Sequence, residues 1–482
     1  MSRNHRLLLA VLILPGCAVG PDYKPAAAPA DVSGFIREPL MQVQAAGVNT
    51  QVFNTRSDIS AQWWEAFRSP ALDARVRQAL ANSPTLAAAE AALQQARENT
   101  AAQYGAYFPS VQADYSPSRQ RNAVGTISPT LTSGQPVYTL HTAQLSVSYA
   151  ADVFGLNRRQ VESLQAQEEI QQAQLQAARQ TLAANVVAAS IQEASLRAQL
   201  EATQELITAN REALQLVQRQ AELGYASGLD VAAQEAALAQ AEQQLPPLQR
   251  LLAQTLDLLA VLGGNMPTTA GAGTIDLATL TLPADLPVSL PSHLVNNRPD
   301  LRAAAAQVHS ASAQVGVALA NRFPQFSLSA AYGGSATQFS QMFSSDNIFW
   351  AVTGNVTAPL FDFGVLRHRQ RAAEAALDQA KAQYRLAVLG AFQNVADSLY
   401  ALDSDARALA SAQTAEVAAQ RTTALTRRQV ELGATARPAL LAAEVAQQQA
   451  VLLRLQAQQA RYTDTVALFQ ALGGPWPSAA DH

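Results

Sequence analysis

Four short stretches of the chain alternate apolar and polar residues with a period of two. In the first of them, VQADYS, the apolar residues Val111, Ala113 and Tyr115 are separated by single polar residues. This spacing is typical of a β-strand with one apolar and one polar face, because successive side chains point to opposite sides. The predicted strands lie within residues 111–116, 144–149, 326–332 and 350–357. Their predicted polar faces contain Gln112, Asp114, Gln144, Ser146, Ser148, Ser327, Ser329, Thr353 and Asn355.

Two other stretches are long and almost without helix breakers. Residues 156–223 contain no glycine or proline, and residues 365–432 contain only Gly390. A helix of this length would extend roughly 100 Å. A short turn, LGYASGLD or LGATARP, and a second helical pattern follow each stretch, so the sequence predicts two very long helical hairpins. Pro246 and Pro247 should kink or break the return helix of the first hairpin.

The chain contains the same unit twice. The motif NSPTL at Asn82 returns as NRPDL at Asn297, an offset of 215 residues, and the FG pair at Phe154 returns at Phe363, an offset of 209. Offsets that change so little indicate one duplicated unit. We expect a signal peptide at 1–16, a lipidated extended segment at 17–68, a first repeat at 69–264, a linker at 265–291, a second repeat at 292–474 and a C-terminal tail at 475–482.

The N-terminus has the features of an export signal. Basic residues precede an apolar run from Leu7 to Leu14, which is shorter than the roughly 20 residues of a membrane-spanning helix. The following LPGC contains the single cysteine of the chain, Cys17, at the position where bacterial lipoproteins are cleaved and acylated. We therefore expect Cys17 to carry a lipid. The alternative is an incidental cysteine beside an ordinary cleavage site.

Composition and charge exclude several classes of protein. Charged residues make up 15% of the chain and the net charge is −4, so the basic surface of a nucleic-acid-binding protein is missing. One cysteine can form neither an intramolecular disulfide nor a cysteine-based metal cluster. The six histidines lack the spacing of metal ligands, and the DFG tripeptide at Asp362 lacks the other motifs of a kinase. We expect no enzyme activity, no cofactor, no metal and no nucleic-acid partner.

The four strands admit two interpretations. They could cover a soluble core, as half-buried sheets usually do, or they could lie in a membrane. Export and aromatic residues near the strand ends favour segments of an outer-membrane β-barrel with a wet interior. Four strands cannot close a barrel and an open edge is not tolerated in hydrocarbon, so several chains would have to share one barrel.

More specific motifs point to a known family. The run QWWEAFRSPALDARVRQALANSPTLAAAEAAL, the start CAVGPDYKP, the two FG junctions and the two LGG endings resemble the outer-membrane efflux proteins of the TolC and OprM type. The resemblance implies an α+β membrane protein that forms a homotrimer, with a shared 12-stranded β-barrel in the outer membrane and a periplasmic α-barrel built from the hairpins. It also implies a periplasmic adaptor (membrane fusion) protein, an inner-membrane RND-type pump and outer-membrane lipid as partners.

This resemblance implies the exit duct of a tripartite efflux system in the cell outer membrane, which conducts drugs or other small toxic compounds passively. The polar strand faces would line the pore. The two hairpin turns would form a tip that faces the pump and contacts the adaptor or acts as a gate. The alternatives are a duct for type I protein secretion and a secreted coiled-coil scaffold without a pore.

The residues expected at the tip come from both turns. Asp230 matches a position where the family has an aspartate that narrows the entrance, although an aspartate there can also serve as a helix N-cap. The second turn has Leu440-Leu441-Ala442-Ala443 where the family often has LLDA, so closure would depend on other residues or on apolar packing. The candidate tip and gate residues are Leu223, Gly224, Asp230, Leu432, Gly433, Arg437 and Glu444.

Overall fold

The main secondary-structure elements occur twice in the same order. The computed structural model describes residues 18–24, 35–36, 42–45, 48–54, 59–121, 137–268, 273–287, 294–295 and 297–474. The first half of the chain contains α2 (Pro84–Tyr104), β3 (Ser110–Arg121), β4 (Val137–Ala151), α3 (Leu156–Glu222) and α4 (Gly228–Leu262). The second half contains α6 (Pro299–Ala320), β6 (Gln325–Ala336), β7 (Ile348–Thr357), α7 (Val365–Glu431) and α8 (Arg437–Leu472).

The chain folds into two compact units whose boundaries differ from those of the two sequence repeats. One unit comprises Met1–Ala26, Ala92–Gln171 and Ala304–Tyr384, and the second comprises Ala27–Ala91, Gln172–Ala303 and Arg385–His482. Each unit takes residues from both halves of the chain, and the long helices α3 and α7 contribute to both units. The two repeats predicted from the sequence are therefore duplicated stretches of sequence and not two separately compact units. Their exact boundaries stay a prediction.

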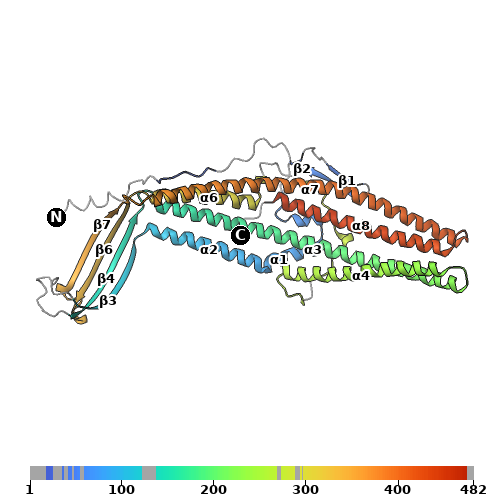
Figure 1. Cartoon of the computed structure of the whole chain (residues 1–482), viewed down its shortest axis with the longest axis horizontal. Coiled ribbons are helices and arrows are strands. Elements are labelled where there is room, and N and C mark those ends of the chain that lie inside the picture. The colour runs from blue at the N-terminus through green and yellow to red at the C-terminus, as the bar shows by residue number, and fades with distance from the viewer. Residues whose placement is uncertain are drawn as a thin grey trace. The chain divides into compact units, whose positions relative to one another are not determined.

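The first unit contains a four-stranded antiparallel sheet in the order β3-β4-β6-β7, whose strands lie side by side in Figure 1. β4 pairs with β3 from Ser148, opposite Ser110, to Val137, opposite Arg121. β4 also pairs with β6, so the two halves of the chain meet in one sheet. The four strands include all four stretches that alternate in the sequence, which confirms that prediction.

The second unit contains the turns and return helices of two long hairpins. α3 and α7 each have 67 residues and end one residue before the predicted limits, so the predicted long helices are confirmed. An ion pair of 3.0 Å between Arg211 and Glu242 joins α3 to α4. The hydroxyl of Thr423 donates a hydrogen bond of 3.1 Å to the carbonyl of Ala443 and joins α7 to α8. The predicted hairpins are therefore present.

Of the two predicted effects of Pro246 and Pro247, a break in the return helix is wrong, and a kink stays a prediction. α4 continues through both prolines from Gly228 to Leu262. The two missing N–H groups would have donated to the carbonyls of Glu242 and Gln243, which are exposed residues. Water can solvate these carbonyls, so the helix continues with two fewer hydrogen bonds.

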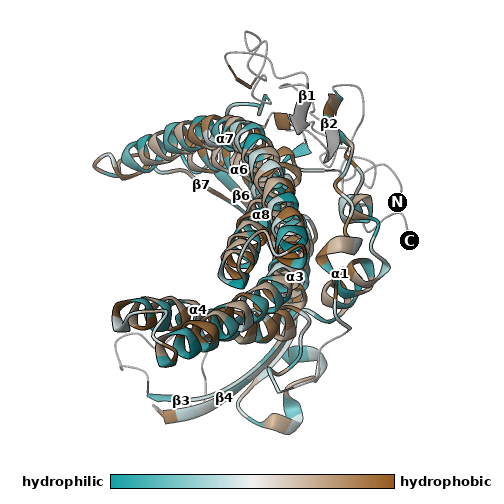
Figure 2. Cartoon of the chain, turned by 90° about the vertical axis from the view of Figure 1, so that its right-hand side faces the viewer, coloured by the Kyte–Doolittle hydropathy of each residue, from teal (hydrophilic) through white to brown (hydrophobic). Residues whose placement is uncertain are grey.

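Small side chains form much of the buried surface of α3. Ala183, Val187 and Ser190 are each 0% exposed, and Ala184 is 2% exposed. Small residues allow neighbouring helices to approach closely. Figure 2 shows brown and teal positions mixed around α3, α4, α7 and α8, which fits helices that pack on one side and remain polar on another.

An aromatic core in the second unit lies next to the short helix η2 (Trp63–Phe67) and the helix α1 (Pro70–Asn82). The ring of Trp63 stacks on Phe469 of α8 with centroids 5.2 Å apart, and Phe67 is 0% exposed. The indole N–H of Trp64 donates a hydrogen bond of 3.0 Å to Asp73. These contacts fix the segment before the first repeat to the end of the last helix.

A second, smaller sheet was not expected from the sequence. It has the order β1-β2-β5, and β2 pairs in parallel with β5. The segment predicted to be a linker at 265–291 therefore contributes a strand. The strands are β1 (Gln42–Ala45), β2 (Val48–Asn54) and β5 (Asp285–Pro287).

Candidate functional site

The nine residues predicted for the polar strand faces lie on one face of the four-stranded sheet. The register pairs Asp114 with Gln144 and Gln112 with Ser146. It also aligns Ser148 with Ser329 and Ser329 with Thr353, which extends the same row over the other strands. The hydroxyls of Ser110 and Ser148 are 2.8 Å apart, and Ser146 donates a hydrogen bond of 3.3 Å to Asp114. The residues sharing this face are Gln112, Asp114, Gln144, Ser146, Ser148, Ser327, Ser329, Thr353 and Asn355.

The opposite face of the sheet is apolar, and many of its large side chains are exposed. Trp350 is 75% exposed, which is unusual for a tryptophan in a folded chain. A continuous apolar surface of this kind indicates an interaction site. Other exposed apolar side chains on this face are Val111, Tyr115, Leu145, Leu328, Tyr332, Val352 and Val356.

The first hairpin turn combines a glycine C-cap with a strong N-cap. Gly224 has a φ of +79°, and the N–H of Tyr225 donates to the carbonyl of Gln220 at 2.7 Å, which closes the end of α3. Ser227 is the N-cap of α4, and its hydroxyl accepts from the N–H of Asp230 at 3.3 Å. Leu223 is 66% exposed, so the turn also presents an apolar side chain.

Asp230 is not itself the N-cap that the sequence allowed for; it is the partner of the N-cap. Its carboxylate accepts from the backbone N–H of Ser227 at 2.8 Å and from the Ser227 hydroxyl at 2.7 Å. The two residues form a capping box because α4 begins at Gly228. Hydrogen bonds from the Ser227 backbone and side chain hold the pKa of Asp230 below its ordinary value. The carboxylate therefore remains charged, and its hydrogen bonds to Ser227 cap the start of α4.

The second turn has the same C-cap and a different helix start. Gly433 has a φ of +71°, and the N–H of Ala434 donates to the carbonyl of Gln429 at 2.8 Å. Leu432 is 67% exposed, like its counterpart in the first turn. The N-cap of α8 is Ala436, which has no side-chain hydrogen bond, and a proline in the first turn replaces the capping box.

The two remaining tip candidates, Arg437 and Glu444, take part in exposed ion pairs. Arg437 lies 3.4 Å from Glu212 of α3, so it joins the two hairpins. Glu444 lies 3.0 Å from Arg427 of α7, so it joins the two helices of its own hairpin. The structure brings these charges near the turns but does not place them in contact with Asp230 in any recorded hydrogen bond or ion pair among the described residues.

Cys17 lies outside the described residues, but the segment that follows it is held tightly in the first unit. The guanidinium of Arg159 lies 2.8 Å from Asp22 and 2.7 Å from Glu162. The ring of Tyr23 stacks on His309 with centroids 4.3 Å apart. Burial lowers the pKa of Arg159, but the hydrogen bonds that its guanidinium donates to Asp22 and Glu162 raise the pKa above its ordinary value, so this arginine stays positively charged.

Sequence reasoning missed a buried charge cluster in the second hairpin. Arg461 of α8 is 0% exposed, and its three guanidinium nitrogens have no hydrogen-bond partner among the described residues. Asp405 of α7 lies nearby and one of its carboxylate oxygens is also buried without a partner. Burial, and then the neighbouring Asp464, raise the pKa of Asp405 to about 7. The pattern of the long helices gave no signal for this cluster, because it depends on which helix faces meet.

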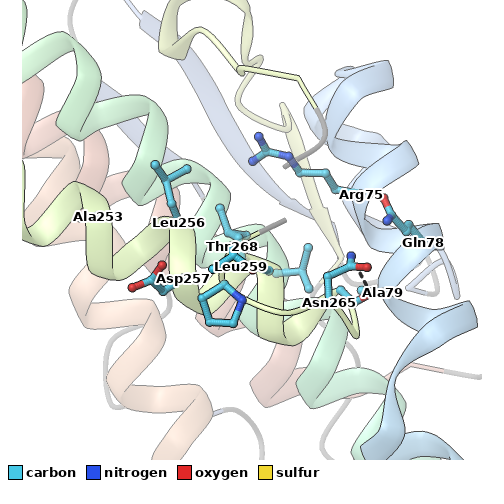
Figure 3. A pocket seen from close by; sticks show the side chains of 13 residues that line it. Arg75, Gln78, Ala79, Ala253, Leu256, Asp257, Leu259, Asn265 and Thr268 are labelled. Atoms are coloured by element: carbon cyan, nitrogen blue, oxygen red, sulfur yellow. Dashed lines mark hydrogen bonds between the residues drawn. The ribbon is translucent and has the colours of Figure 1, made fainter. Parts of the chain in front are cut away.

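A cavity of about 480 Å³ lies in the second unit between α1, α3 and α4 (Figure 3). Arg75 reaches toward it from α1, and its guanidinium is 2.6 Å from Glu193, which is only 1% exposed. Arg197 holds the other carboxylate oxygen of Glu193. The carboxylate is therefore neutralised on both sides, and this cluster serves to hold α1 against α3.

The described residues contain no group of histidine, cysteine and carboxylate side chains arranged to hold a metal ion. Within the same part of the chain, no helix has a stretch that is both long and apolar enough to cross a membrane.

Comparison with known proteins agrees with the fold. The family model of the outer membrane efflux proteins matches residues 76–265 and 290–474. The pyoverdine export outer membrane protein OpmQ of Pseudomonas aeruginosa is 32% identical over 488 residues, which cover 99% of this chain and 98% of that protein. The probable efflux pump outer membrane protein TtgC of Pseudomonas putida is 30% identical, over 98% of this chain and 95% of that protein.

Solved structures give the same result. The outer-membrane channel OprN superposes with a TM-score of 0.82 at 28% identity, over 95% of this chain and all of that chain. The open state of the MtrE outer membrane channel of Neisseria gonorrhoeae superposes with a TM-score of 0.80 at 23% identity, which supports the fold alone. The chain therefore belongs to the outer membrane efflux protein family, and it is an outer-membrane channel that serves as the exit duct of an efflux system.

Proposed function

We propose that three copies of the chain assemble into one channel that receives small toxic compounds from an inner-membrane RND-type pump through a periplasmic adaptor. Each copy contributes its four strands to a shared barrel in the outer membrane and its hairpins to a periplasmic tunnel. The polar face with Asp114 and Gln144 lines the pore, and the apolar face with Trp350 meets lipid. Transport through the duct is passive, and the pump supplies the energy.

The observation that carries this proposal is a sheet whose outer strands each lack a second strand partner among the described residues, and whose apolar face remains largely exposed. β3 and β7 are its outer strands, and each has ten or more residues. Unpaired N–H and C=O groups of an edge strand each cost several kcal/mol in hydrocarbon, where water cannot satisfy them. Pairing β7 of one copy with β3 of the next satisfies these groups and closes the barrel.

Disulfide scanning of the two edges tests the shared barrel. In a Cys17→Ser background, Thr353→Cys in β7 is combined in turn with Ser110→Cys, Gln112→Cys or Asp114→Cys in β3. Oxidation of the membranes should give covalent dimers and closed trimers for the pair that is in register. The matched control is Ser148→Cys with Ser329→Cys, which face each other within one chain and should give monomers only. Monomers for every edge pair would contradict the shared barrel.

The cargo is expected to be selected by the pump and not by this chain. Relatives of similar identity are named for pyoverdine export, antibiotic efflux, toluene efflux and solvent efflux. Ducts of one family thus serve chemically different compounds, which supports a wide polar tunnel without a dedicated recognition site. Exchange of the adaptor and pump pair should change the exported compounds, whereas substitutions on the polar strand face should not. A secretion duct for polypeptides would instead require a partner pump that accepts unfolded chains.

The lipid on Cys17 is proposed as a secondary anchor. The segment 18–24 that follows is fixed to the first unit through Asp22 and Tyr23, so an acyl chain on Cys17 would start close to Gly155, where β4 ends and α3 begins. Labelling with a radioactive fatty acid tests this. Incorporation should be lost in Cys17→Ser, and wild-type protein without label would contradict it.

The turns are proposed to form the pump-facing tip, and the contribution of Asp230 to gating can be separated from its contribution to capping. Asp230→Ala removes both the charge and the capping box, whereas Ser227→Ala removes the cap and keeps the charge. If Asp230 gates, the single-channel conductance in a planar bilayer should rise in Asp230→Ala and not in Ser227→Ala. Equal conductance in both variants and the wild type would leave Asp230 as a capping residue.

A further inference from the structure

The loop between β6 and β7, residues 337–347, has a defined shape of its own. It contains two short helices, η6 (Phe339–Gln341) and η7 (Ser345–Asn347). The side-chain amide of Asn347 donates to the carbonyl of Gln341 and to the hydroxyl of Ser344, each at 2.9 Å. The Ser344 hydroxyl donates to the carbonyl of Gln341 at 2.9 Å. A compact loop closed by its own hydrogen bonds presents the same side chains in a fixed arrangement.

This loop folds back over the apolar face of the sheet. The ring of Phe339 contacts both Tyr115 of β3 and His141 of β4 edge-on, with centroids 6.0 Å away in each case. The hydroxyl of Tyr115 and Nδ1 of His141 are 2.9 Å apart. Tyr115 pairs with Ala143, two residues after His141, so both rings lie on the face that carries Leu145.

A glycine makes this close approach possible. Gly334 of β6 shares the apolar face with Tyr332, and a methyl group in place of its hydrogen would overlap the backbone carbonyl of Met342. The ring of Phe343 would lie 3.3 Å from the same methyl group. Met342 is only 2% exposed although it belongs to a loop. The loop backbone is therefore packed directly against the strand on its apolar side.

The folded loop exposes two aromatic side chains among polar residues that are almost all uncharged. Phe339 is 62% exposed and Phe343 is 66% exposed, and Asp346 is the only ionisable residue between positions 337 and 347. Ile348 and Trp350 at the start of β7 are exposed as well, and Ile348 pairs with Gly334, against which Phe343 packs. Exposed aromatic rings at the end of a membrane-spanning strand fit the interface between hydrocarbon and headgroups.

We propose that residues 337–347 form a lipid-facing lip, in which Phe339 and Phe343 insert into the outer leaflet of the membrane and the loop leaves the polar face of the sheet uncovered. The inference rests on the proposed function for two statements, that the strands lie in the membrane with their apolar face toward lipid and that the polar face lines the pore. Lipid is the occupant because the lip continues the apolar strand surface and has almost no charge. A loop on this side of the sheet cannot close the exit, so closure has to occur elsewhere in the channel.

Spin labels test the lip in the full-length protein reconstituted into bilayers of phospholipid and lipopolysaccharide. In a Cys17→Ser background, the introduced cysteine is the single thiol of the chain. Labels are placed at Phe343→Cys on the lip, at Ser345→Cys beside Asp346 in the same loop, and at Val352→Cys and Asn355→Cys on the two faces of β7. Collision rates with oxygen report lipid, and collision rates with a water-soluble nickel chelate report water.

The ratio of the oxygen collision rate to the nickel collision rate should be severalfold higher for the labels at 343 and 352 than for the labels at 345 and 355. If the label at 343 has the same collision ratio as the label at 345 while the label at 352 reports lipid, the proposed lip is wrong, but the placement of the strands in the membrane is supported. If the label at 352 also collides mainly with nickel, the placement of the strands in the membrane is wrong as well.

Phe339→Trp, which conserves an aromatic ring, gives a second readout. Its added fluorescence should be quenched by brominated lipid, and quenching by aqueous iodide alone would overturn the proposal.

Discussion

The hairpins α3–α4 and α7–α8 come from one duplicated unit, yet they are stabilised by different means. Both turns use a glycine with positive φ to end the first helix, Gly224 or Gly433. The first return helix starts with the capping box of Ser227 and Asp230, whereas the second starts at Ala436 without a side-chain cap. Duplication thus preserved the turn geometry, which only glycine adopts easily, and not the side chains that stabilise the helix start.

The interiors of the two hairpins differ as well. At the offset of 209 residues, Asp405 of α7 corresponds to Leu196 of α3, which is 2% exposed. The first hairpin therefore buries an apolar residue where the second buries a carboxyl group next to Arg461. A buried carboxyl group makes the stability of the second hairpin depend on pH, and a leucine does not.

The largest difference between the hairpins should disappear in Asp405→Asn. The pKa of Asp405 in the folded chain is about 7, above the ordinary value of 3.8, so its contribution to stability is present at low pH and is lost as the pH rises through 7. Asn cannot ionise, and we expect this variant to be about 1–3 kcal/mol more stable than the wild type at pH 8. Thermal unfolding in detergent at pH 5 and pH 8 measures this. An unchanged pH dependence in the variant would refute the assignment, and Leu196→Val is a control without a titrating group.

The shared turn geometry predicts equal effects at the two glycines. Gly224→Ala and Gly433→Ala should each lower the free energy of unfolding by about 1–2 kcal/mol, because the left-handed conformation is unfavourable for residues with a Cβ atom. A methyl group at either position has no neighbour within 4 Å, so backbone strain is the sole cause. Gly228→Ala, at an open position without positive φ, is the control and should be neutral or stabilising. Clearly unequal effects of the first two variants would show that the turns differ.

The difference in N-capping between α4 and α8 can be removed by a substitution in either hairpin. Ser227→Ala should destabilise the first hairpin by about 1 kcal/mol. Ala436→Ser should stabilise the second hairpin by a similar or smaller amount, because it supplies the missing cap. As the pH falls through the lowered pKa of Asp230, the first hairpin should lose the contribution of the capping box. Hydrogen exchange of the first amides of α4 and α8 reports each helix start separately, and no change in α4 for Ser227→Ala would contradict the capping box.

The smallest effect should come from the ion pair that joins the two hairpins. Arg437 and Glu212 are both exposed and 3.4 Å apart, so Arg437→Gln should cost about 0.2–1 kcal/mol and less at high salt. Arg428→Gln, which removes an exposed pair within one helix, is the matched control. A loss well above this range would mean that Arg437 has a further partner in the assembled channel.

Most of the fold could be predicted because the signals are local. Val111 to Ser116 alternate with period two, and α3 and α7 run through stretches that lack proline and contain only one glycine, Gly390. The capping box was also readable, since Ser227 precedes the acidic Asp230 by three residues. Pro246 and Pro247 do not end α4 because the carbonyls that lose their N–H partners belong to exposed residues, which a sequence pattern does not reveal.

The remaining features depend on contacts between distant segments. The Asp405 and Arg461 cluster exists only because α7 and α8 present those faces to each other. The packing of Met342 on Gly334 requires that the loop turn toward one particular face of the sheet. The strand β5 pairs with β2 although more than two hundred residues separate them. Periodicity and propensity describe single elements, and these features are properties of pairs of elements.

The central claim is that the four strands of one chain are part of a barrel shared by several chains. The mass of the purified protein in detergent micelles, measured by light scattering and corrected for bound detergent, tests it most directly. A shared barrel predicts a particle of three chains that dissociates on heating and aggregates when detergent is removed. A monodisperse single chain that stays in solution without detergent would contradict it.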